Sequence, residues 1–281
     1  MIKQDKLRFG TAGIPLSTPD RNIINGVSFV RKLGLECMEL EFVRAVNVSQ
    51  EKAPIIKDLA KKNDVMLTCH GQYFINLNSN EEEKVQASMH RIYQAAKIAS
   101  MCGAYSLTFH AAFYQGVTRE KVTENVAANI KKIVYELKKE GYDNIWIRPE
   151  TTGKDSQWGT LKEILDVSKQ FDCVLPCVDF SHIHARSGGK ENSFEDFKQS
   201  LAMIEKDFGR IGLDNMHIHV SGINYTDKGE RNHLDLPESD MNYKDLMKAF
   251  SEFKIKGCVI SESPNIEGDA LLMQKTFEKE K

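Results

Sequence analysis

The sequence predicts a single (β/α)8 barrel of the TIM type that spans residues 1–281 as one domain. The length of 281 residues fits the roughly 250 residues of such a barrel. Short strand-like segments alternate with amphipathic segments along the whole chain, and histidines and carboxylates recur where the predicted strands end. Because no linker or low-complexity stretch divides the chain, we expect one domain.

The predicted strands are short and rich in Val, Ile, Leu, Phe or Cys, with apolar residues in succession instead of alternation. This pattern is typical of parallel strands that are buried on both faces. We predict strands over 7–10, 37–42, 65–70, 105–110, 144–150, 173–179, 215–220 and 258–262.

An amphipathic segment follows each strand, and within 119–140 the apolar residues recur at helical spacing. Ser49 and Asn80 stand where helix N-caps are expected. Glycines that favour left-handed caps fall beyond three helix ends, at Gly34, Gly103 and Gly141. We predict helices over 21–33, 51–63, 81–102, 119–140, 159–170, 194–208, 242–254 and 268–279. The polar stretch from Ser221 to Asp240 is long for a connection, so we expect a functional loop there.

Composition indicates a soluble globular protein, with 41% hydrophobic and 28% charged residues. No run approaches the ~20 apolar residues of a membrane span, and the first residues lack the apolar core of a secretory signal. We therefore expect a cytoplasmic protein without a membrane partner. The six cysteines form no CxxC pair and are predicted to be reduced and structural. A net charge of −2 argues against a generally basic nucleic-acid coat, although a local basic patch is compatible with it.

Metal-ligand residue types end six successive predicted strands. In a (β/α)8 barrel the carboxyl ends of the strands meet at one rim, where the functional site is built. The six residues are His70, His110, Glu150, Asp179, His219 and Glu262. Two more histidines follow strands six and seven, namely His182 and His233.

Imidazole combined with carboxylate suits Zn²⁺, Mn²⁺ or Fe²⁺, whereas an all-oxygen set would suit Mg²⁺ or Ca²⁺. Eight candidate ligands exceed the four of one tetrahedral zinc, so we predict two or three metals that share a carboxylate. Clusters of this kind serve hydrolysis at phosphorus. One histidine at a strand end would more often be structural, and only the recurrence over six strands indicates a site.

The remaining histidines fit other roles. His217 precedes His219 by two residues, so it is expected one layer deeper, in the core or behind the ligands. His184 is expected behind the ligands, and His90 on a helix surface. Other chemistries lack support, because the chain contains no GxSxG elbow, Walker A loop or GxGxxG after its first strand.

The ligand motifs resemble those of the endonuclease IV family of apurinic/apyrimidinic endonucleases, which are zinc-dependent DNA-repair enzymes on a TIM barrel. The resemblance covers nearly the whole chain. It rests on His-Gly-Gln-Tyr-Phe-Ile-Asn-Leu at 70–77, Phe-His at 109–110, Pro-Glu-Thr-Thr-Gly at 149–153, Cys-Val-Asp-Phe-Ser-His at 177–182 and Glu-Ser-Pro at 262–264.

The resemblance implies three zinc sites. The first would be formed by His70, His110 and Glu150. Glu150 would bridge to the second, completed by Asp179, His219 and Glu262. The third would include His182 and His233. Glu150 and Glu262 are the catalytic carboxylates in this scheme.

Two features bear on the third site and on DNA. The family places an Asp two residues before its last histidine, where this chain has Arg231, and Glu230 or Asp235 are the alternatives. The family also inserts loop side chains into the DNA at the lesion, for which Arg44 and Tyr73 are candidates. Loop cations that could contact phosphate are Arg44, Arg186, Lys190, Lys228 and Arg231.

The function implied is hydrolysis of the phosphodiester on the 5′ side of an abasic site, which leaves a 3′-hydroxyl and a 5′-deoxyribose phosphate. Water activated by two or three Zn²⁺, or by Mn²⁺, and oriented by Glu150 would attack phosphorus in line. The abasic nucleotide would be flipped into the barrel mouth. The partner would be damaged double-stranded DNA, bound by a monomer.

Two alternatives remain. A sugar isomerase or epimerase similar to xylose isomerase holds one metal, for which Glu150, Asp179, His219 and Glu262 would suffice. His70, His110 and His233 favour the nuclease, since a single-metal isomerase has no need of them. A scaffold that only binds nucleic acid would not require intact ligands.

Overall fold

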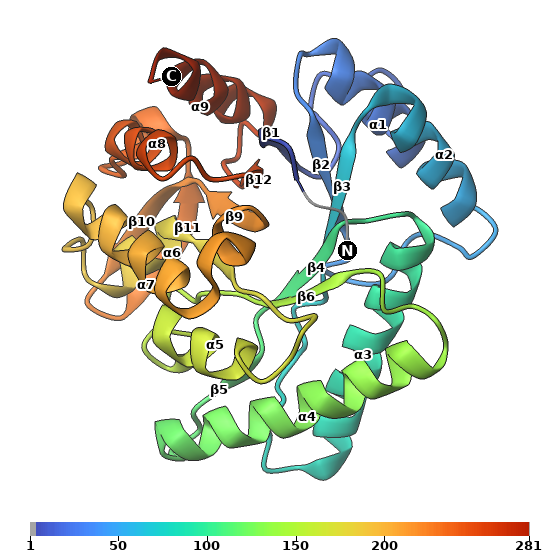
Figure 1. Cartoon of the computed structure of the whole chain (residues 1–281), viewed down its shortest axis with the longest axis vertical. Helices are drawn as coiled ribbons and strands as arrows, with labels where there is room; N and C mark the ends of the chain where they lie inside the picture. Colours follow the sequence, from blue (N-terminus) through green and yellow to red (C-terminus); the bar gives the residue numbers. More distant parts are fainter. Residues whose placement is uncertain (1–3, 281) are drawn as a thin grey trace.

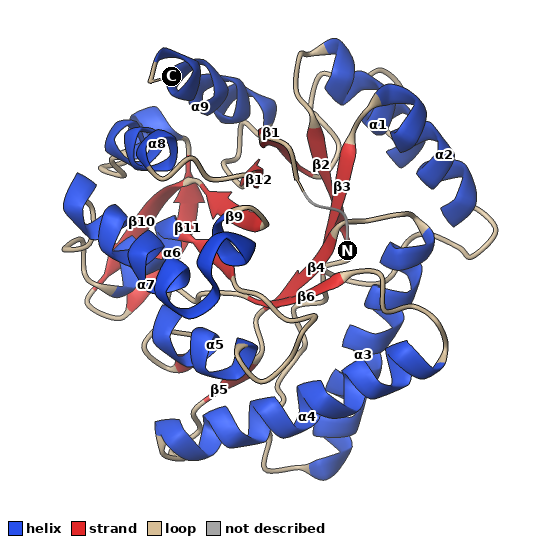
Figure 2. Ribbon diagram, in the orientation of Figure 1, coloured by secondary structure: helices blue, strands red, loops and turns tan. Residues whose placement is uncertain are grey.

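The structure is a computed structural model that describes residues 4–280, and it confirms the predicted barrel. Within these residues one eight-stranded parallel sheet is surrounded by helices (Figures 1 and 2). The strand order around the sheet is β6-β4-β3-β2-β1-β12-β9-β8. The strands are β1 (Leu7–Ala12), β2 (Cys37–Glu41), β3 (Met66–His70), β4 (Ser106–Phe109), β6 (Trp146–Pro149), β8 (Cys177–Asp179), β9 (Met216–Val220) and β12 (Gly257–Ser261).

The barrel closes between β6 and β8. Two isolated parallel bridges, Ile147 to Val174 and Glu150 to Cys177, join these strands. The predicted strand 173–179 is regular only over Cys177–Asp179, because Pro176 has no N–H for the ladder. Arg148, which is buried, spans the seam by donating from Nη1 to the carbonyl oxygen of Pro176 at 2.8 Å.

The helices lie outside the sheet and confirm the predicted alternation. They are α1 (Ile23–Lys32), α2 (Ala53–Asn63), α3 (Glu82–Met101), α4 (Arg119–Lys139), α5 (Leu161–Ser168), α6 (Phe180–Arg186), α7 (Phe194–Leu213), α8 (Tyr243–Glu252) and α9 (Glu267–Lys279). The prediction for α7 ended at residue 208, and the helical turns continue past a break at Gly209, which has φ of 57° and ψ of −146°.

The predicted caps were partly correct. Gly34, Gly103 and Gly141 adopt φ of 83°, 73° and 78° directly after helices, as expected for left-handed caps. Ser49 and Asn80 were wrong as N-caps, because α2 and α3 begin later, after Lys52 and Glu81.

Four segments escaped the prediction. The stretch from Ser221 to Asp240 is not an irregular loop but a hairpin of β10 (Gly222–Thr226) and β11 (Gly229–Leu234), followed by the 3-10 helix η1 (Leu236–Glu238). Helix α6 lies inside the predicted connection after Asp179, and the two-residue strands β5 (Ala112–Phe113) and β7 (Gln157–Trp158) pair beside the barrel. These segments are too short or too polar to show hydrophobic periodicity.

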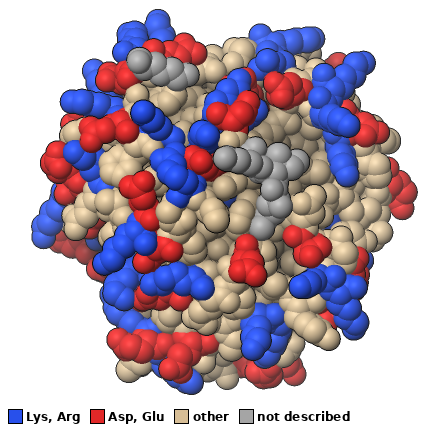
Figure 3. All heavy atoms as spheres, viewed as in Figure 1, with Lys and Arg blue, Asp and Glu red and all other residues tan. Residues whose placement is uncertain are grey.

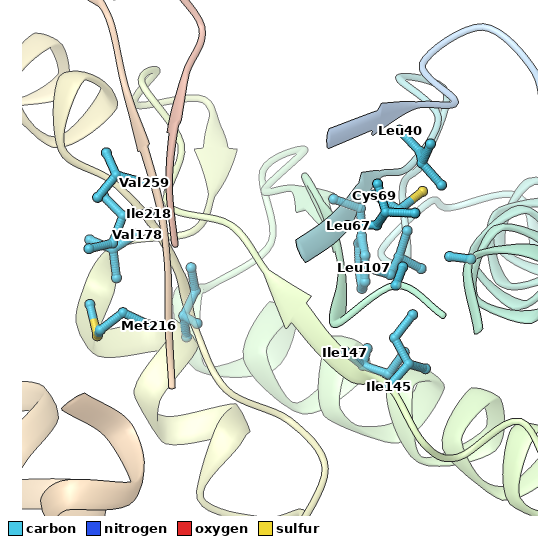
Figure 4. Packing of buried hydrophobic residues seen from close by; sticks show 14 of the residues in the cluster. Leu40, Leu67, Cys69, Leu107, Ile145, Ile147, Val178, Met216, Ile218 and Val259 are labelled. Carbon is cyan, nitrogen blue, oxygen red and sulfur yellow. The ribbon is translucent and has the colours of Figure 1, made fainter. Parts of the chain in front are cut away.

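The apolar core lies between the sheet and the helices. Figure 4 shows its side chains on two sides of the barrel, with Leu40, Leu67 and Leu107 on one side and Val178 and Ile218 on the other. Because side chains alternate along a strand, the residues that alternate with these apolar ones point into the barrel. These inward-pointing residues are largely polar, up to the carboxyl ends of the strands.

Several further features bear on the sequence predictions. All six cysteines are free, and five of them are buried. None of the helices within residues 4–280 combines the length and apolar character that a membrane crossing needs. On the face of the molecule that Figure 3 shows, Lys and Arg are interspersed with Asp and Glu.

Candidate metal centre

The six strand-end side chains converge around Glu150, whose own side chain is buried. Parallel pairing sets neighbouring strand ends side by side, for example Asp179 of β8 opposite His219 of β9. Glu150 Oε1 lies 3.3 Å from His110 Nε2 and 3.3 Å from His219 Nδ1, and Glu150 Oε2 lies 3.4 Å from His70 Nε2. The carboxylate predicted as the bridge is therefore at the centre of the cluster.

Two groups of potential ligand atoms share Glu150. In each group, one ligand atom per residue lies within 4.8 Å of the others. The first group consists of His70, His110 and Glu150. The second consists of Glu150, Asp179, His219 and Glu262.

A third group forms beside them from His182, Glu230 and His233. Glu230 Oε2 lies 3.5 Å from His182 Nε2, and Glu230 Oε1 lies 4.0 Å from His233 Nε2. Of the two alternatives that the sequence left open, the structure brings Glu230 to the histidines. Asp235 lies elsewhere and accepts a hydrogen bond from the backbone N–H of Asn265 at 3.0 Å.

A β-bulge explains how Glu230 reaches the position. In the hairpin Tyr225 pairs with Glu230 and Asn224 pairs with Asn232, so Arg231 is an extra residue without a partner in the ladder. Residues three apart in a regular strand face opposite sides, but one inserted residue returns them to the same side. The bulge thus compensates for the three-residue spacing between Glu230 and His233, and Arg231 is exposed to solvent.

Two glycines let the hairpin approach the barrel. Glu230 N donates to the carbonyl oxygen of Gly153 at 2.9 Å. A Cβ atom on Gly153 would lie 2.6 Å from Glu230 Cβ and 3.1 Å from His182 Cδ2. Gly229 has φ of 88°, and a Cβ there would lie 2.1 Å from the oxygen of Gly153. Only glycine allows this backbone contact, which sets Glu230 against His182.

Backbone carbonyls orient three of the histidines. The Nδ1 atoms of His70, His182 and His233 lie 2.7, 3.0 and 3.1 Å from the carbonyl oxygens of Gly71, Thr151 and Glu262. An Nδ1–H that donates to a carbonyl leaves Nε2 with its lone pair. In His70, His182 and His233 that atom faces a carboxylate of the cluster, where a metal ion would bind.

Burial and neighbouring charge perturb the cluster strongly. Burial and the adjacent Glu150 raise the pKa of Asp179 to about 6. Burial alone would also raise the pKa of Glu150, but His110 and His219 lower it well below its usual value. For His70, burial would lower the pKa, yet the contact with Glu150 raises it to about 10.

The donor set fits divalent metal ions. Several carboxylates that crowd one buried space repel each other unless cations compensate them. His110 Nε2 and Asp179 Oδ2 are buried and have no hydrogen-bond partner among residues 4–280. Such atoms are satisfied when they coordinate a cation, and mixed imidazole and carboxylate donors suit Zn²⁺ or Mn²⁺.

Sequence reasoning missed Glu39 and Glu41 of β2. Glu39 is fully buried, with Oε1 at 2.9 Å from His219 Nε2 and Oε2 at 3.0 Å from His217 Nε2. Burial and the nearby Glu39 raise the pKa of Glu41 to about 8. The available signal was the alternation of these acids with Met38 and Leu40 in a strand predicted to be buried.

The other histidines lie outside the ligand groups around Glu150. His217 is fully buried one layer below His219, as expected. His184 is not behind the ligands: it lies on α6 with Nε2 at 3.0 Å from Asp240 Oδ1. His90 is exposed on α3, as expected.

Two of the predicted DNA-contacting residues lie in loops that are bonded to each other. Tyr73 N donates to the oxygen of Val43, and Gln72 Nε2 donates to the oxygen of Arg44, so the loops after β2 and β3 form one unit. Arg44 is exposed, and Tyr73 is 63% exposed beside His70, with ring centroids 6.1 Å apart. The exposed cations include Lys190, Lys228 and Arg231. Arg186 is instead committed to Thr152, whose Oγ1 accepts from Nη1 at 2.9 Å.

Comparisons with known proteins are consistent with this architecture. A family model described as "Xylose isomerase-like TIM barrel" matches residues 27–278. An uncharacterized protein of Methanocaldococcus jannaschii is 41% identical over 277 residues, which are 99% of each chain. A "Probable endonuclease 4" of Mycoplasma genitalium is 23% identical over 204 residues, 71% of this chain and 67% of that protein.

Solved structures show the same fold with different activities in their names. Endonuclease IV from Thermus thermophilus has a TM-score of 0.72 at 16% identity and covers 96% of this chain and 99% of its own. The 3-keto-D-glucoside 4-epimerase from E. coli has a TM-score of 0.71 at 13% identity, and the match covers 98% of this chain and 100% of the epimerase chain.

Proposed function

Because the chain belongs to the xylose isomerase-like TIM barrel family, we propose that it is a metal-dependent phosphodiesterase. It hydrolyses DNA on the 5′ side of an abasic site and uses zinc. The observation that carries the proposal is the third ligand group, His182, Glu230 and His233, beside the two groups that share Glu150. A sugar epimerase with one metal ion has no use for this third group.

The residues of the centre would divide three metal ions among them. His70 and His110 would hold the first with Glu150, and Asp179, His219 and Glu262 would hold the second with the same carboxylate. His182, Glu230 and His233 would hold the third. Bound zinc supplies a water of lowered pKa and positive charge for the oxygens at phosphorus.

The protein groups position the reaction. Glu150 contacts His70, His110 and His219, so its carboxylate sets the spacing of the first two groups and orients the attacking water. Glu262 completes the second group from the end of β12. Because these side chains extend from the rim of a closed sheet, their geometry is fixed before substrate binds.

DNA would bind across the barrel mouth. Arg44 and Tyr73 form one projecting unit beside His70, and an aromatic side chain exposed next to the cluster can replace an unstacked base. Arg231 projects from the hairpin beside the third group, where its charge would contact phosphate. Lys190 and Lys228 are exposed cations in the neighbouring loops.

One observation favours the alternative, a single-metal sugar epimerase. Glu150, Asp179, His219 and Glu262 form a complete four-ligand group without the other two. An epimerase is among the proteins with the same fold. The two functions differ in metal content and in substrate, so one set of measurements separates them.

The test uses zinc-loaded protein and a duplex with a single abasic analogue. We expect three zinc ions per chain and an incision that leaves a 3′-hydroxyl, with none on the same duplex without the lesion. The variant Glu163→Gln serves as the control for the loss of a buried carboxylate outside the metal centre. Glu163 is buried like the carboxylates of the centre but lies in the capping box of α5. One metal per chain, together with turnover of a ketose and no incision, would overturn the proposal.

A further inference from the structure

We propose that Glu39 is a positioning residue that fixes the tautomer and ring orientation of His219 and thereby sets the affinity of the second metal site. This inference rests on the proposed metal centre and deepens it. It assigns a role to a buried carboxylate in the barrel interior, one layer below the ligands themselves.

The imidazole of His219 spans two carboxylate environments. Its Nδ1 lies 3.3 Å from Glu150 Oε1 and 3.3 Å from Glu262 Oε1, on the side of the metal centre. Its Nε2 lies 2.9 Å from Glu39 Oε1. A neutral imidazole that binds a metal through Nδ1 carries its proton on Nε2.

That proton needs an acceptor, because His219 is fully buried. A buried N–H without a partner loses its hydration and gains nothing in return. Neither the Nε2 atom of His219 nor the Oε1 atom of Glu39 makes a hydrogen bond of standard geometry in the described part of the chain, and the two atoms face each other at 2.9 Å. Glu39 is the carboxylate within reach, and a carboxylate that accepts from the distal N–H of a ligand histidine orients the ring and raises its basicity.

His219 differs in this respect from the other oriented histidines. His70, His182 and His233 direct Nδ1 at backbone carbonyls and turn Nε2 toward the cluster. His219 has the reverse orientation, and a side chain faces its distal nitrogen. Among these four histidines, His219 is therefore the one whose ring orientation can be changed by substituting a single side chain.

Glu39 is itself held in place by a chain of contacts across the barrel. Thr68 Oγ1 donates to Glu39 Oε2 at 2.8 Å, and His217 Nε2 lies 3.0 Å from the same oxygen. On the far side of its ring, His217 Nδ1 lies 2.9 Å from Ser106 Oγ. The contacts join β2, β3, β9 and β4, so the position of Glu39 is set by the sheet.

The experiment compares Glu39→Gln with wild type and with Glu163→Gln, the buried carboxylate in α5. Zinc is counted per chain, and the affinity of each site is measured by competition with a chelator. Long-range ¹H–¹⁵N NMR of the histidine side chains reports which ring nitrogen carries the proton. Thermal unfolding of the metal-free proteins measures any general loss of stability.

We expect Glu39→Gln to weaken one zinc by about 10–100-fold, the usual loss when a partner behind a ligand histidine is removed. The other two zinc ions stay tight, and the Nε2–H signal of His219 shifts or is lost. Glu163→Gln lowers thermal stability without changing any zinc affinity. If Glu39→Gln fails to fold, Thr68→Val removes only the hydroxyl that holds Glu39, and we expect roughly fivefold weaker binding at the same site.

The outcomes separate this inference from the function on which it rests. Wild-type protein that binds no zinc would remove the proposed function and this inference together. Three tight zinc ions in both wild type and Glu39→Gln, with the same His219 tautomer, would overturn the inference alone. A fourth zinc in wild type that Glu39→Gln loses would also overturn it, since Glu39 would then be a ligand.

Discussion

The candidate centre combines two regions that are built differently. Six of its side chains extend from the ends of barrel strands, around Glu150. The group of His182, Glu230 and His233 instead comes from helix α6 and from the hairpin β10–β11. Hydrogen-bonded register fixes the strand-end group, whereas the hairpin group depends on a bulge and on contact between two glycines.

The difference shows two ways in which a protein places ligands. A closed parallel sheet brings strand ends together whatever the loops do, so residue type at the strand end is sufficient. A hairpin outside the sheet can place a carboxylate at a spacing that a regular strand would not allow. We therefore expect the two regions to respond differently to substitution.

The largest effect should follow a change in the carboxylate that the first two groups share. Glu150→Gln is expected to weaken both zinc ions of the strand-end region and to lower incision by at least about 10²–10³-fold, the loss typical when one group that stabilises transition-state charge is removed. Zinc counting and incision of the abasic duplex measure it. Loss of all three ions to the same degree would show that the two regions are not independent.

A smaller effect is expected in the hairpin region. Glu230→Gln should weaken one zinc by about 10–100-fold, a size known for changes around metal sites, and leave two in place. Gly153→Ala should give the same result, because its Cβ would lie 2.6 Å from Glu230 Cβ and displace it. Gly141→Ala is the control, since Gly141 has open space around it, so that an added Cβ meets no neighbour, although its φ of 78° makes alanine strained there. Retention of three tight zinc ions in Glu230→Gln would rule out Glu230 as a ligand.

The two regions should also differ in their response to pH when metal is absent. Burial, with Glu39 beside it, raises the pKa of Glu41 to about 8, and burial with Glu150 raises that of Asp179 to about 6. A carboxyl whose pKa is raised by folding binds its proton more tightly in the folded state, so the free energy of unfolding falls as pH rises from about 4 to about 8. Bound metal replaces those protons, and the Tm difference between loaded and metal-free protein should therefore grow over this range.

A variant in each region checks the assignment. Glu41→Gln should raise the Tm of the metal-free protein at pH 8 by a few degrees, since about 1 kcal/mol corresponds to ~2–4 °C in chains of this size. Burial would raise the pKa of Glu230, but His182 and His233 lower it, so its own titration is complete above about pH 5. At higher pH, Glu230→Gln should change the slope only through His182 and His233, whose pKa values the charge of Glu230 pushes upward. An equal change of slope in both variants would contradict the assignment.

The smallest effect is expected at the bulge residue. Arg231→Ala should leave the zinc content unchanged, because Arg231 is exposed while Glu230 faces the histidines. The loss of its contact with phosphate should appear only in DNA binding. The slope of log affinity against log salt concentration should be smaller in magnitude by about one for the variant than for wild type. Asn232→Ala is the matched control on the same strand.

Deletion of Arg231 tests the bulge directly. The deletion would place Glu230 two residues before His233, and a regular strand then presents both on one side. We expect the third zinc to be retained. Its loss would mean that the bulge does more than correct the spacing.

Much of the barrel could be predicted because its signals are local. The runs that end at His70, His110 and His219 are short and β-prone, each ends on a candidate ligand, and the closed sheet brings such ends together. The hairpin was predicted as a loop because β11 (Gly-Glu-Arg-Asn-His-Leu) is polar, so hydrophobic periodicity could not reveal it. Glu39 was missed because no role can be assigned to an acid in a buried strand until its partners across the barrel are known.

The sequence by itself determined the fold class and the order of the candidate ligands at the strand ends, because both follow from residue type and from the period of the chain. The central place of Glu150 came from the resemblance to the endonuclease IV family. The tertiary structure alone decided that Glu230 and not Asp235 joins the third group, and that Glu39 faces His219. The physical reason is that Glu230 meets Gly153 and His182, and Glu39 meets His219, across chain segments far apart in sequence, which only the folded chain brings together.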